Sequence, residues 1–233
     1  MSVPEYFATL DRFGLAELKC GGDLQVKNSN IALTADGDFQ FGNTRFNALF
    51  RLVERWRLNQ TTLNELFNSM YLTSQRLEEV IKARTHGTGP SVSLNPAAFH
   101  EETESIGDYE SGSSVFAGAI LVVLNNLLQR FKKDLNSSGN QWGSAGPKVN
   151  GYSIGVIFAA AAANFRHHDE WARTQMPNTS MEVLCAILDR PLMTNGFPTI
   201  RANVCRDVIM IVSGGSVDRL YQITFEYAKA LST

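Results

Sequence analysis

The fold is decided by residues 154–171, which read IGVIFAAAAANFRHHDEW. Five consecutive alanines follow a run of apolar residues, and alanine has the highest intrinsic helix propensity. This composition predicts a helix that is apolar on most of its surface and is therefore buried. The same helix ends in an arginine, two histidines and two carboxylates, so a core element carries a cluster of ionisable groups at its end.

A second apolar stretch at residues 115–128 predicts another core helix, which we expect to continue to residue 135. Residues 181–188 and 217–231 have helical patterns as well, whereas residues 200–212 fit either a helix or a strand. The predicted fold class is therefore mainly α, with a helical bundle as its core. Both apolar stretches are shorter than the roughly 20 residues that span a membrane, so we expect no membrane segment.

The N-terminal part adds a small antiparallel β-hairpin or meander to this bundle. Residues 15–42 contain segments that alternate apolar and polar side chains, and Asp36-Gly37 is a favourable tight turn. An amphipathic helix follows, because apolar side chains recur at helical spacing in residues 46–56. Two further helical segments are expected to end near Ala83.

These patterns divide the chain into three regions. Residues 1–84 hold the β-hairpin and the amphipathic helices. Residues 85–114 are acidic, contain glycine and proline, and are expected to form a linker or loop with a short helix near residues 96–104. Residues 115–233 form the predicted helical core domain.

Composition restricts the function. A chain of 233 residues with 44% hydrophobic residues can bury one substantial core without a metal or disulfides. Its 21 basic and 23 acidic residues give a net charge of -2, so any contact with nucleic acid has to be local. Glycine-rich phosphate loops are missing, and we expect no cofactor. The cysteines lack CxxC spacing, so we expect Cys20, Cys185 and Cys205 to be buried free thiols. The N-terminus lacks a signal-peptide pattern, and together with the free thiols this predicts that the protein is cytoplasmic.

The ionisable cluster has the composition of an acid–base site. Neighbouring residues on a helix point about 100° apart, so only one of His167 and His168 can face a given pocket. A histidine exchanges a proton near neutral pH, an arginine holds a phosphate, and a carboxylate orients the imidazole. Together they predict metal-independent RNA cleavage. The candidate catalytic residues are Arg166, His167, His168, Asp169 and Glu170, and the candidate RNA contacts are Asn164, Arg173 and, from the first amphipathic helix, Arg55.

A helical protein whose alanine-rich core helix runs into Asn-Phe-Arg-His-His-Asp-Glu-Trp resembles the HEPN superfamily. The resemblance implies an all-helical ribonuclease of a bacterial toxin–antitoxin or antiphage system. It also implies a homo-oligomer that completes the site, and a protein partner such as an antitoxin or a defence-complex subunit. The family's basic-plus-histidine pair falls on Arg166, His167 and His168. Its usual spacing, an arginine followed four to six positions later by a histidine, is absent from this sequence.

Two alternatives explain the same residues. The cluster can cap the helix, pair its charges locally and anchor Trp171, in which case the chain is a noncatalytic interaction or regulatory subunit. A metal site is the other alternative, with His168 and a neighbouring carboxylate joined by ligands from the acidic segment. Those additional ligands would come from His100, Glu101, Glu102 and Glu104.

The first amphipathic helix carries a weaker basic pattern. Arg51, Arg55 and Arg57 lie beside Trp56, a combination that can contact RNA phosphates and stack a base. Glu54 lies among them, and an ordinary solvated helix face explains the same residues. RNA is therefore an expected partner at two separate places in the sequence.

Overall fold

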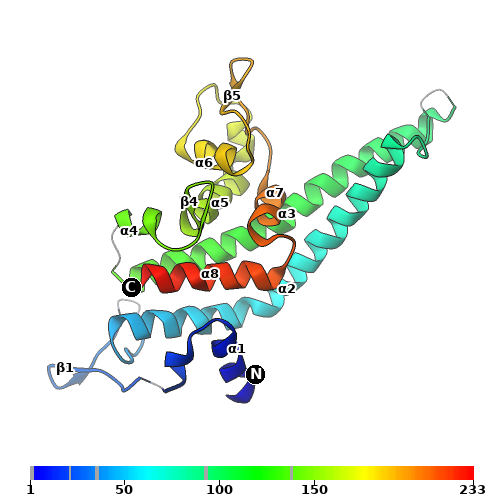
Figure 1. Cartoon of the computed structure of the whole chain (residues 1–233). Coiled ribbons are helices and arrows are strands. Elements are labelled where there is room, and N and C mark those ends of the chain that lie inside the picture. Colours follow the sequence, from blue (N-terminus) through cyan, green and yellow to red (C-terminus); the bar gives the residue numbers. More distant parts are fainter. Residues whose placement is uncertain (1–2, 21, 35–36, 92–93, 137–138) are drawn as a thin grey trace. The chain divides into compact units, whose positions relative to one another are not determined.

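A computed structural model describes residues 3–20, 22–34, 37–91, 94–136 and 139–233 (Figure 1). The helices are α1 (Val3–Arg12), η1 (a 3₁₀ helix, Ala16–Cys20), α2 (Thr44–Thr85), α3 (Pro96–Asp134), α4 (Gly139–Ser144), α5 (Ile154–Trp171), α6 (Thr179–Ile187), α7 (Cys205–Ser213) and α8 (Val217–Leu231). The strands pair in antiparallel hairpins, β1 (Val26–Lys27) with β2 (Asn30–Ile31), β3 (Lys148–Val149) with β4 (Tyr152–Ser153), and β5 (Met193–Thr194) with β6 (Phe197–Pro198). The predicted mainly α fold with a small N-terminal β-hairpin is confirmed.

The chain forms two compact units, and neither unit is a continuous piece of sequence. Unit 1 comprises Met1–Gln60, Leu124–Phe158 and Asp218–Thr233. Unit 2 comprises Thr61–Val123 and Ala159–Val217. The long helices α2, α3 and α5 each contribute residues to both units. The predicted regions, by contrast, were consecutive, because a hydrophobic pattern shows which residues are buried and not which segments pack together.

The core of unit 1 is built around Trp56 of α2. This indole is 1% exposed and makes edge-on contacts with three aromatic rings. The centroid distances are 5.2 Å to Phe13, 5.2 Å to Tyr221 and 5.5 Å to Phe225. Such T-shaped pairs stabilise a core beyond the area they bury. Because Trp56 is buried in this cluster, it is not available to stack a base.

The predicted β-meander forms a small N-terminal arm in unit 1, residues 24–34 and 37–41. Its backbone amides close a ring, with Gln25 donating to Gln40 at 2.9 Å, Ala32 to Gln25 at 2.8 Å and Gln40 to Ala32 at 3.0 Å. These three residues are half-buried, whereas the alternate apolar residues are exposed. The exposed apolar side chains are Leu24, Val26, Ile31, Leu33 and Phe39. Of the predicted turn at Asp36-Gly37, Asp36 lies outside the described residues.

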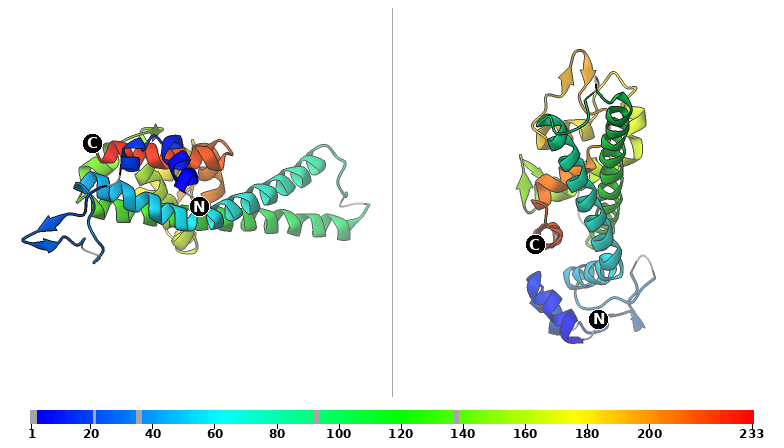
Figure 2. Two further views of the ribbon diagram at one scale, coloured as in Figure 1. Left: turned by 90° about the horizontal axis from the view of Figure 1, so that it is seen from below. Right: turned by 90° about the vertical axis from the view of Figure 1, so that its right-hand side faces the viewer.

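In unit 2, the second half of α2 and the first half of α3 run antiparallel, side by side (Figure 2). Arg84 joins them, since its guanidinium lies 4.2 Å from the centre of the Phe99 ring and donates to the Thr103 hydroxyl at 3.1 Å. The three segments predicted between residues 44 and 83 are one continuous helix. Residues 200–212, whose sequence pattern fits either a helix or a strand, contain the helix α7.

The prediction that residues 85–114 form a linker with only a short helix near residues 96–104 is wrong for most of that segment, because α3 begins at Pro96 and continues to Asp134. The side chain of Asn95 accepts a hydrogen bond from the Ala98 amide at 3.2 Å and so caps the helix. Proline is well suited to the first turn of a helix, where its missing N–H has no partner to lose. This Asn-Pro start allows the helix to continue through Gly107 and Gly112 into the apolar stretch.

Helix α5 approaches α3 closely within unit 2. A side chain at Gly118 would overlap the Phe165 ring, so the absence of a Cβ atom lets the two helices meet. Ala160, Ala161 and Ala162 are at most 3% exposed, as the alanine-rich sequence predicts for a core helix.

By length and composition alone α3 also qualifies as a membrane-crossing helix, although 56% of its apolar window is buried in the protein. A buried core helix has the same composition, so this is weak evidence for a membrane span. The prediction that the apolar stretches are too short concerned residues 115–128, and α3 extends beyond them at both ends.

The three cysteines are free thiols. Cys185 and Cys205 are buried, as expected, and Cys205 donates to the carbonyl of Ala161 at 3.3 Å. Cys20 is exposed, so the expectation of a buried thiol is wrong there, because this residue ends the short η1 helix at the surface. Burial raises the pKa of the Cys205 thiol to about 12.

Candidate functional site

The last turns of α5 place the two histidines in different surroundings. His167 is solvated, with its side chain 49% exposed and its Nδ1 3.2 Å from a Glu170 oxygen. That carboxylate is itself 76% exposed. The pair is therefore an ordinary contact between residues three apart on a helix surface, where such interactions are weak.

His168 is more enclosed, with 34% of its side chain exposed. Its Nδ1 lies 3.2 Å from the carbonyl oxygen of Phe165, and a carbonyl can only accept, so this contact requires a proton on Nδ1. In the neutral ring Nε2 then carries the lone pair and can accept a proton. The same Nε2 lies 3.4 Å from a carboxylate oxygen of Asp169, whose side chain is 86% exposed.

A groove of about 270 Å³ lies beside His168, entirely within unit 2. One wall is a face of α3, and the other is formed by His168 and the segment that precedes α7. The lining residues are Gly107, Glu110, Ser111, Ser114, Val115, His168, Ala202 and Asn203. The groove therefore combines an imidazole, a carboxylate, two hydroxyls and an amide. The polar residues from α3 and the segment before α7 were not among the predicted site residues.

Asn203 is held firmly in the wall of this groove. Its amide nitrogen donates to the Ser114 carbonyl at 3.2 Å, and its oxygen accepts from the Cys205 amide at 3.1 Å. The first of these bonds ties the segment before α7 to α3. The two walls of the groove are thus connected through a side chain, which fixes the groove without any ligand.

Asn164, a predicted RNA contact, is completely buried at 0% exposure. Its amide nitrogen donates to the Ala202 carbonyl at 3.0 Å, and its oxygen accepts from the Val204 amide at 2.9 Å. Both groups of the side chain are therefore used by the backbone on either side of Asn203. This geometry gives Asn164 a positioning role, in which it holds the wall of the groove.

The predicted arginines of α5 and its C-terminal turn, Arg166 and Arg173, are both exposed. Within the part of the chain that the structure describes, no hydrogen bond or ion pair of either guanidinium is found. Arg201 caps this end of α5, donating from Nε to the Ala172 carbonyl at 3.1 Å and again from Nη2. The sequence alone did not indicate this third arginine.

Arg55, the remaining predicted RNA contact, lies in unit 1 and forms an ion pair with Asp134 at 2.5 Å. The two side chains are 15% and 5% exposed, so this is a buried structural pair. Separating it would leave a charge without compensation, which is costly away from water.

For the metal alternative, the described residues contain no group of three or more His, Cys, Asp or Glu side chains arranged to hold an ion. His100 pairs with Glu104 at 3.3 Å, and these side chains are 75% and 67% exposed. Gly107, the nearest groove residue on α3, follows His100 by roughly 10 Å along the helix axis at 1.5 Å per residue. His168 is thus not brought together with residues 100–104 of α3, the ligands that the metal alternative requires.

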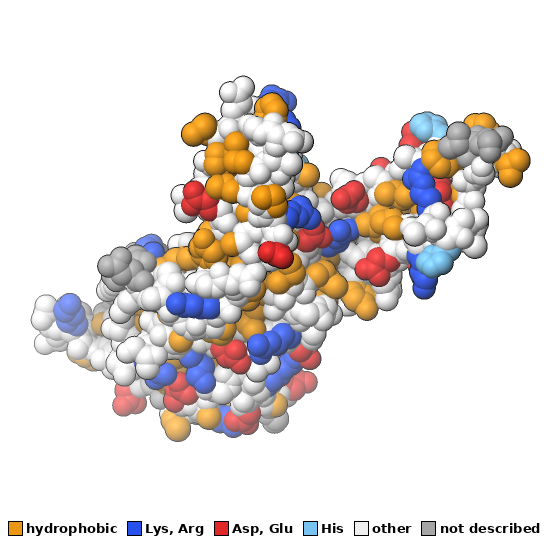
Figure 3. Space-filling model, turned by 45° about the horizontal axis from the view of Figure 1, so that its top comes forward, with side chains coloured by type: hydrophobic (Ala, Val, Ile, Leu, Met, Phe, Trp, Pro, Cys, Tyr) orange, Lys and Arg blue, Asp and Glu red, His pale blue; other side chains and the backbone are white. Residues whose placement is uncertain are grey.

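Chemically, the groove can donate hydrogen bonds from Ser111 and Ser114, exchange a proton at His168, and present the Glu110 carboxylate. The face in Figure 3 carries charged side chains of both signs interspersed, without a large area of one sign. No family model, curated protein or solved structure matches the chain.

Proposed function

We propose that the chain is a metal-independent endoribonuclease, acting as an effector of a bacterial toxin–antitoxin or antiphage system. The observation that supports this most directly is the position of His168 in a groove with Glu110, Ser111 and Ser114. These residues are two proton-exchanging groups and two hydrogen-bond donors, the types that cleavage next to a ribose 2′-hydroxyl requires.

In this mechanism Glu110 takes the proton of the 2′-hydroxyl while its oxygen attacks phosphorus. The bond to the 5′ oxygen breaks, and protonated His168 gives its Nε2 proton to that leaving oxygen. The hydroxyls of Ser111 and Ser114 stabilise the negative charge that develops on the phosphate. The exposed Arg166 and Arg173 hold the neighbouring phosphates, and Asp169 stabilises the imidazolium.

Cleavage of labelled total RNA and tRNA in the presence of EDTA tests the proposal. Because only His168 faces the groove, His168→Ala should lower the cleavage rate by about 10²–10⁴-fold. His167→Ala is the matched control on the same helix turn and should leave the rate within about twofold, since this ring is solvated. Equal losses in the two variants, or cleavage that requires Mg²⁺ or Mn²⁺, would contradict the mechanism.

A noncatalytic interaction or regulatory subunit is the second candidate. It is favoured by the N-terminal arm, where Val26 is 67% exposed and Leu33 is 56% exposed. Apolar side chains gathered on an exposed face are typical of a surface that binds another protein. If the purified chain cleaves no RNA under any of the conditions above, this second function replaces the first.

A further inference from the structure

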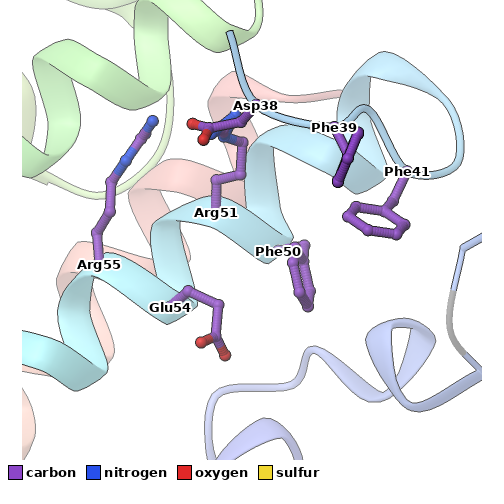
Figure 4. Close-up of a pocket in the computed structure, with 7 residues that line it drawn as sticks. All are labelled: Asp38, Phe39, Phe41, Phe50, Arg51, Glu54 and Arg55. Atoms are coloured by element: carbon purple, nitrogen blue, oxygen red, sulfur yellow. The ribbon is translucent and has the colours of Figure 1, made fainter. Parts of the chain in front are cut away.

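A second pocket, of about 340 Å³, lies within unit 1 beside α2 (Figure 4). It is lined by Asp38, Phe39, Phe41, Phe50, Arg51, Glu54 and Arg55. Ligand-binding pockets combine apolar and aromatic walls with a few charged or polar groups, and this volume is at the lower end of their usual range. The pocket is therefore suited to a small group that has both a ring and a charge.

Arg51 is the polar centre of this pocket. Its side chain is only 12% exposed, Nη2 is ion-paired with Asp38, and Nη1 donates to the Thr34 hydroxyl at 3.1 Å. Its Nε is buried and has no hydrogen-bond partner among the residues that the structure describes. A buried guanidinium needs an anion beside it, and a buried donor without an acceptor is costly. An oxyanion that accepts from Nε would complete this site.

The anion that now accompanies Arg51 can be exchanged at low cost. Asp38 is 61% exposed, so its carboxylate is well hydrated once it leaves the guanidinium. The neighbouring pair of Arg55 and Asp134 is different, because both side chains are buried and the carboxylate is 5% exposed. Asp38 thus occupies a place that another anion can take, whereas Asp134 is a permanent partner.

The aromatic wall adjoins this anion site. Phe41 and Phe50 hold each other, with ring centroids 5.7 Å apart and planes inclined at 59°. Phe39 is 54% exposed, so the face of its ring is accessible to a ligand. Flat aromatic rings stack on such side chains irrespective of their identity, which is how proteins bind the bases of single strands.

The remaining carboxylate of the pocket does not oppose an anion at Arg51. Figure 4 shows Glu54 extending to the side of α2 opposite to Arg51 and Arg55. It is paired there with Arg57 at 2.7 Å. The negative charge of Glu54 is therefore compensated and directed away from the guanidinium.

Another pocket, of about 310 Å³, shares a wall with this one, because Phe41 and Phe50 line both. It is mainly aromatic and is also lined by Lys19 and Tyr6. The Tyr6 hydroxyl is buried and has no hydrogen-bond partner among the described residues. Two ring-sized pockets that share a wall can accommodate two successive bases, which favours a nucleic-acid strand over a single free nucleotide.

We propose that unit 1 binds single-stranded nucleic acid, with one base stacked on Phe39 and its phosphate on Arg51 in place of the Asp38 carboxylate. The phosphate accepts from Nε as well as from Nη2, so the buried donor gains its partner. The following base enters the pocket at Tyr6. This binding does not depend on cleavage at His168, which lies in unit 2.

Fluorescence anisotropy with a fluorescein-labelled RNA decamer and the full chain tests this proposal. The assay uses the His168→Ala background with EDTA, so cleavage cannot consume the probe and a failure of the proposed nuclease leaves the result readable. Arg51→Leu should weaken binding about tenfold or more, because a charged hydrogen-bonding partner is lost. Asp38→Asn should strengthen it several-fold, since the competing charge is removed from the same site.

These opposite effects separate binding from a structural role, because loss of the ion pair alone would act in the same direction in both variants. Phe39→Ala should weaken binding by about 5- to 100-fold through lost stacking. Arg76→Leu is the matched control, an exposed arginine of the same helix that does not line the pocket, and should change affinity less than about twofold. Circular dichroism melting establishes that each variant is folded.

Unlabelled competitors, a DNA decamer and AMP, show whether the pocket binds a nucleic-acid strand or a free nucleotide. If the decamer displaces the labelled RNA and AMP does not, the ligand is a single strand. If AMP competes equally well, the pocket is supported and its ligand is a free nucleotide. The proposal is overturned if the decamer does not bind, or if Asp38→Asn weakens binding as Arg51→Leu does.

Discussion

Substitution of Asn164 by alanine tests whether this residue positions the groove or contacts RNA. The change removes both hydrogen bonds of a side chain that is 0% exposed. It leaves the Ala202 carbonyl and the Val204 amide without their present partners. An unpaired buried polar group costs about 1–3 kcal/mol, so loss of both partners should lower the free energy of unfolding by about 2–6 kcal/mol.

Urea unfolding followed by circular dichroism measures this loss. With a slope of about 1–3 kcal/mol per molar urea, the midpoint should fall by about 0.7 M or more. His167→Ala is the control, because its solvated side chain should contribute less than about 0.5 kcal/mol. A midpoint for Asn164→Ala within the error of the unmodified chain would refute the reasoning. Loss of RNA binding at unchanged stability would instead support a direct contact.

Asn164→Asp refines the same test through pH. An ionised carboxylate cannot donate to the Ala202 carbonyl, whereas the protonated form can. The Asp variant should therefore be destabilised more at pH 7 than at pH 4, relative to the unmodified chain measured at each pH. An equal loss at both values would show that donation to Ala202 is not what stabilises this part of the fold.

Two further predictions concern the core of unit 2. Gly118→Ala should lower the free energy of unfolding by about 1–3 kcal/mol, because its new methyl group overlaps the Phe165 ring. Thermal denaturation measures this loss. A change below about 0.5 kcal/mol would show that α3 and α5 can move apart without cost. Burial raises the pKa of Cys205 from an ordinary value of 9.0 to about 12, so the folded state keeps a proton that the unfolded state has lost in this interval. This contribution is fully present below pH 9 and is lost towards pH 12, by about 1.4 kcal/mol per pH unit. Cys205→Ala should flatten that slope in urea unfolding at pH 8 to 11, and an unchanged slope would contradict the assignment.

Local sequence patterns predict most of the helices correctly. The alanine-rich segment and the apolar stretch after residue 115 are core helices, because their burial follows directly from composition. The expected short helix near residues 96–104 is the start of α3, where Asn95 caps the helix and Pro96 begins it. Its continuation was not predicted, because Gly107, Gly112 and the acidic composition favour a break that the structure does not contain.

The candidate groove was only partly predictable. The helical angle between His167 and His168 shows that they face different directions, and nothing in the local spacing decides which of them meets another element. That choice follows from α3 packing against α5, where Gly118 admits Phe165. Glu110, Ser114 and Asn203 join His168 only through this tertiary contact. No periodic pattern connects such distant segments.

The burial of Trp56 was not predictable for a related reason. Trp56 is adjacent to Arg55 in sequence, and the helical pattern does not show which of its faces another element covers. The indole lies in the core, 1% exposed. The rings that line the same pocket as Arg51 come from Phe50 and from Phe39 and Phe41 of the N-terminal arm.

The two candidate sites can be separated by variants, because each lies within one unit. His168→Ala should abolish cleavage and preserve decamer binding, whereas Arg51→Leu should weaken binding by the same factor with or without His168. If unit 1 delivers RNA to the groove, Asp38→Asn should also raise cleavage at limiting RNA and leave it unchanged at saturation. A rate that rises at saturation as well would mean that Asp38 affects the chemical step.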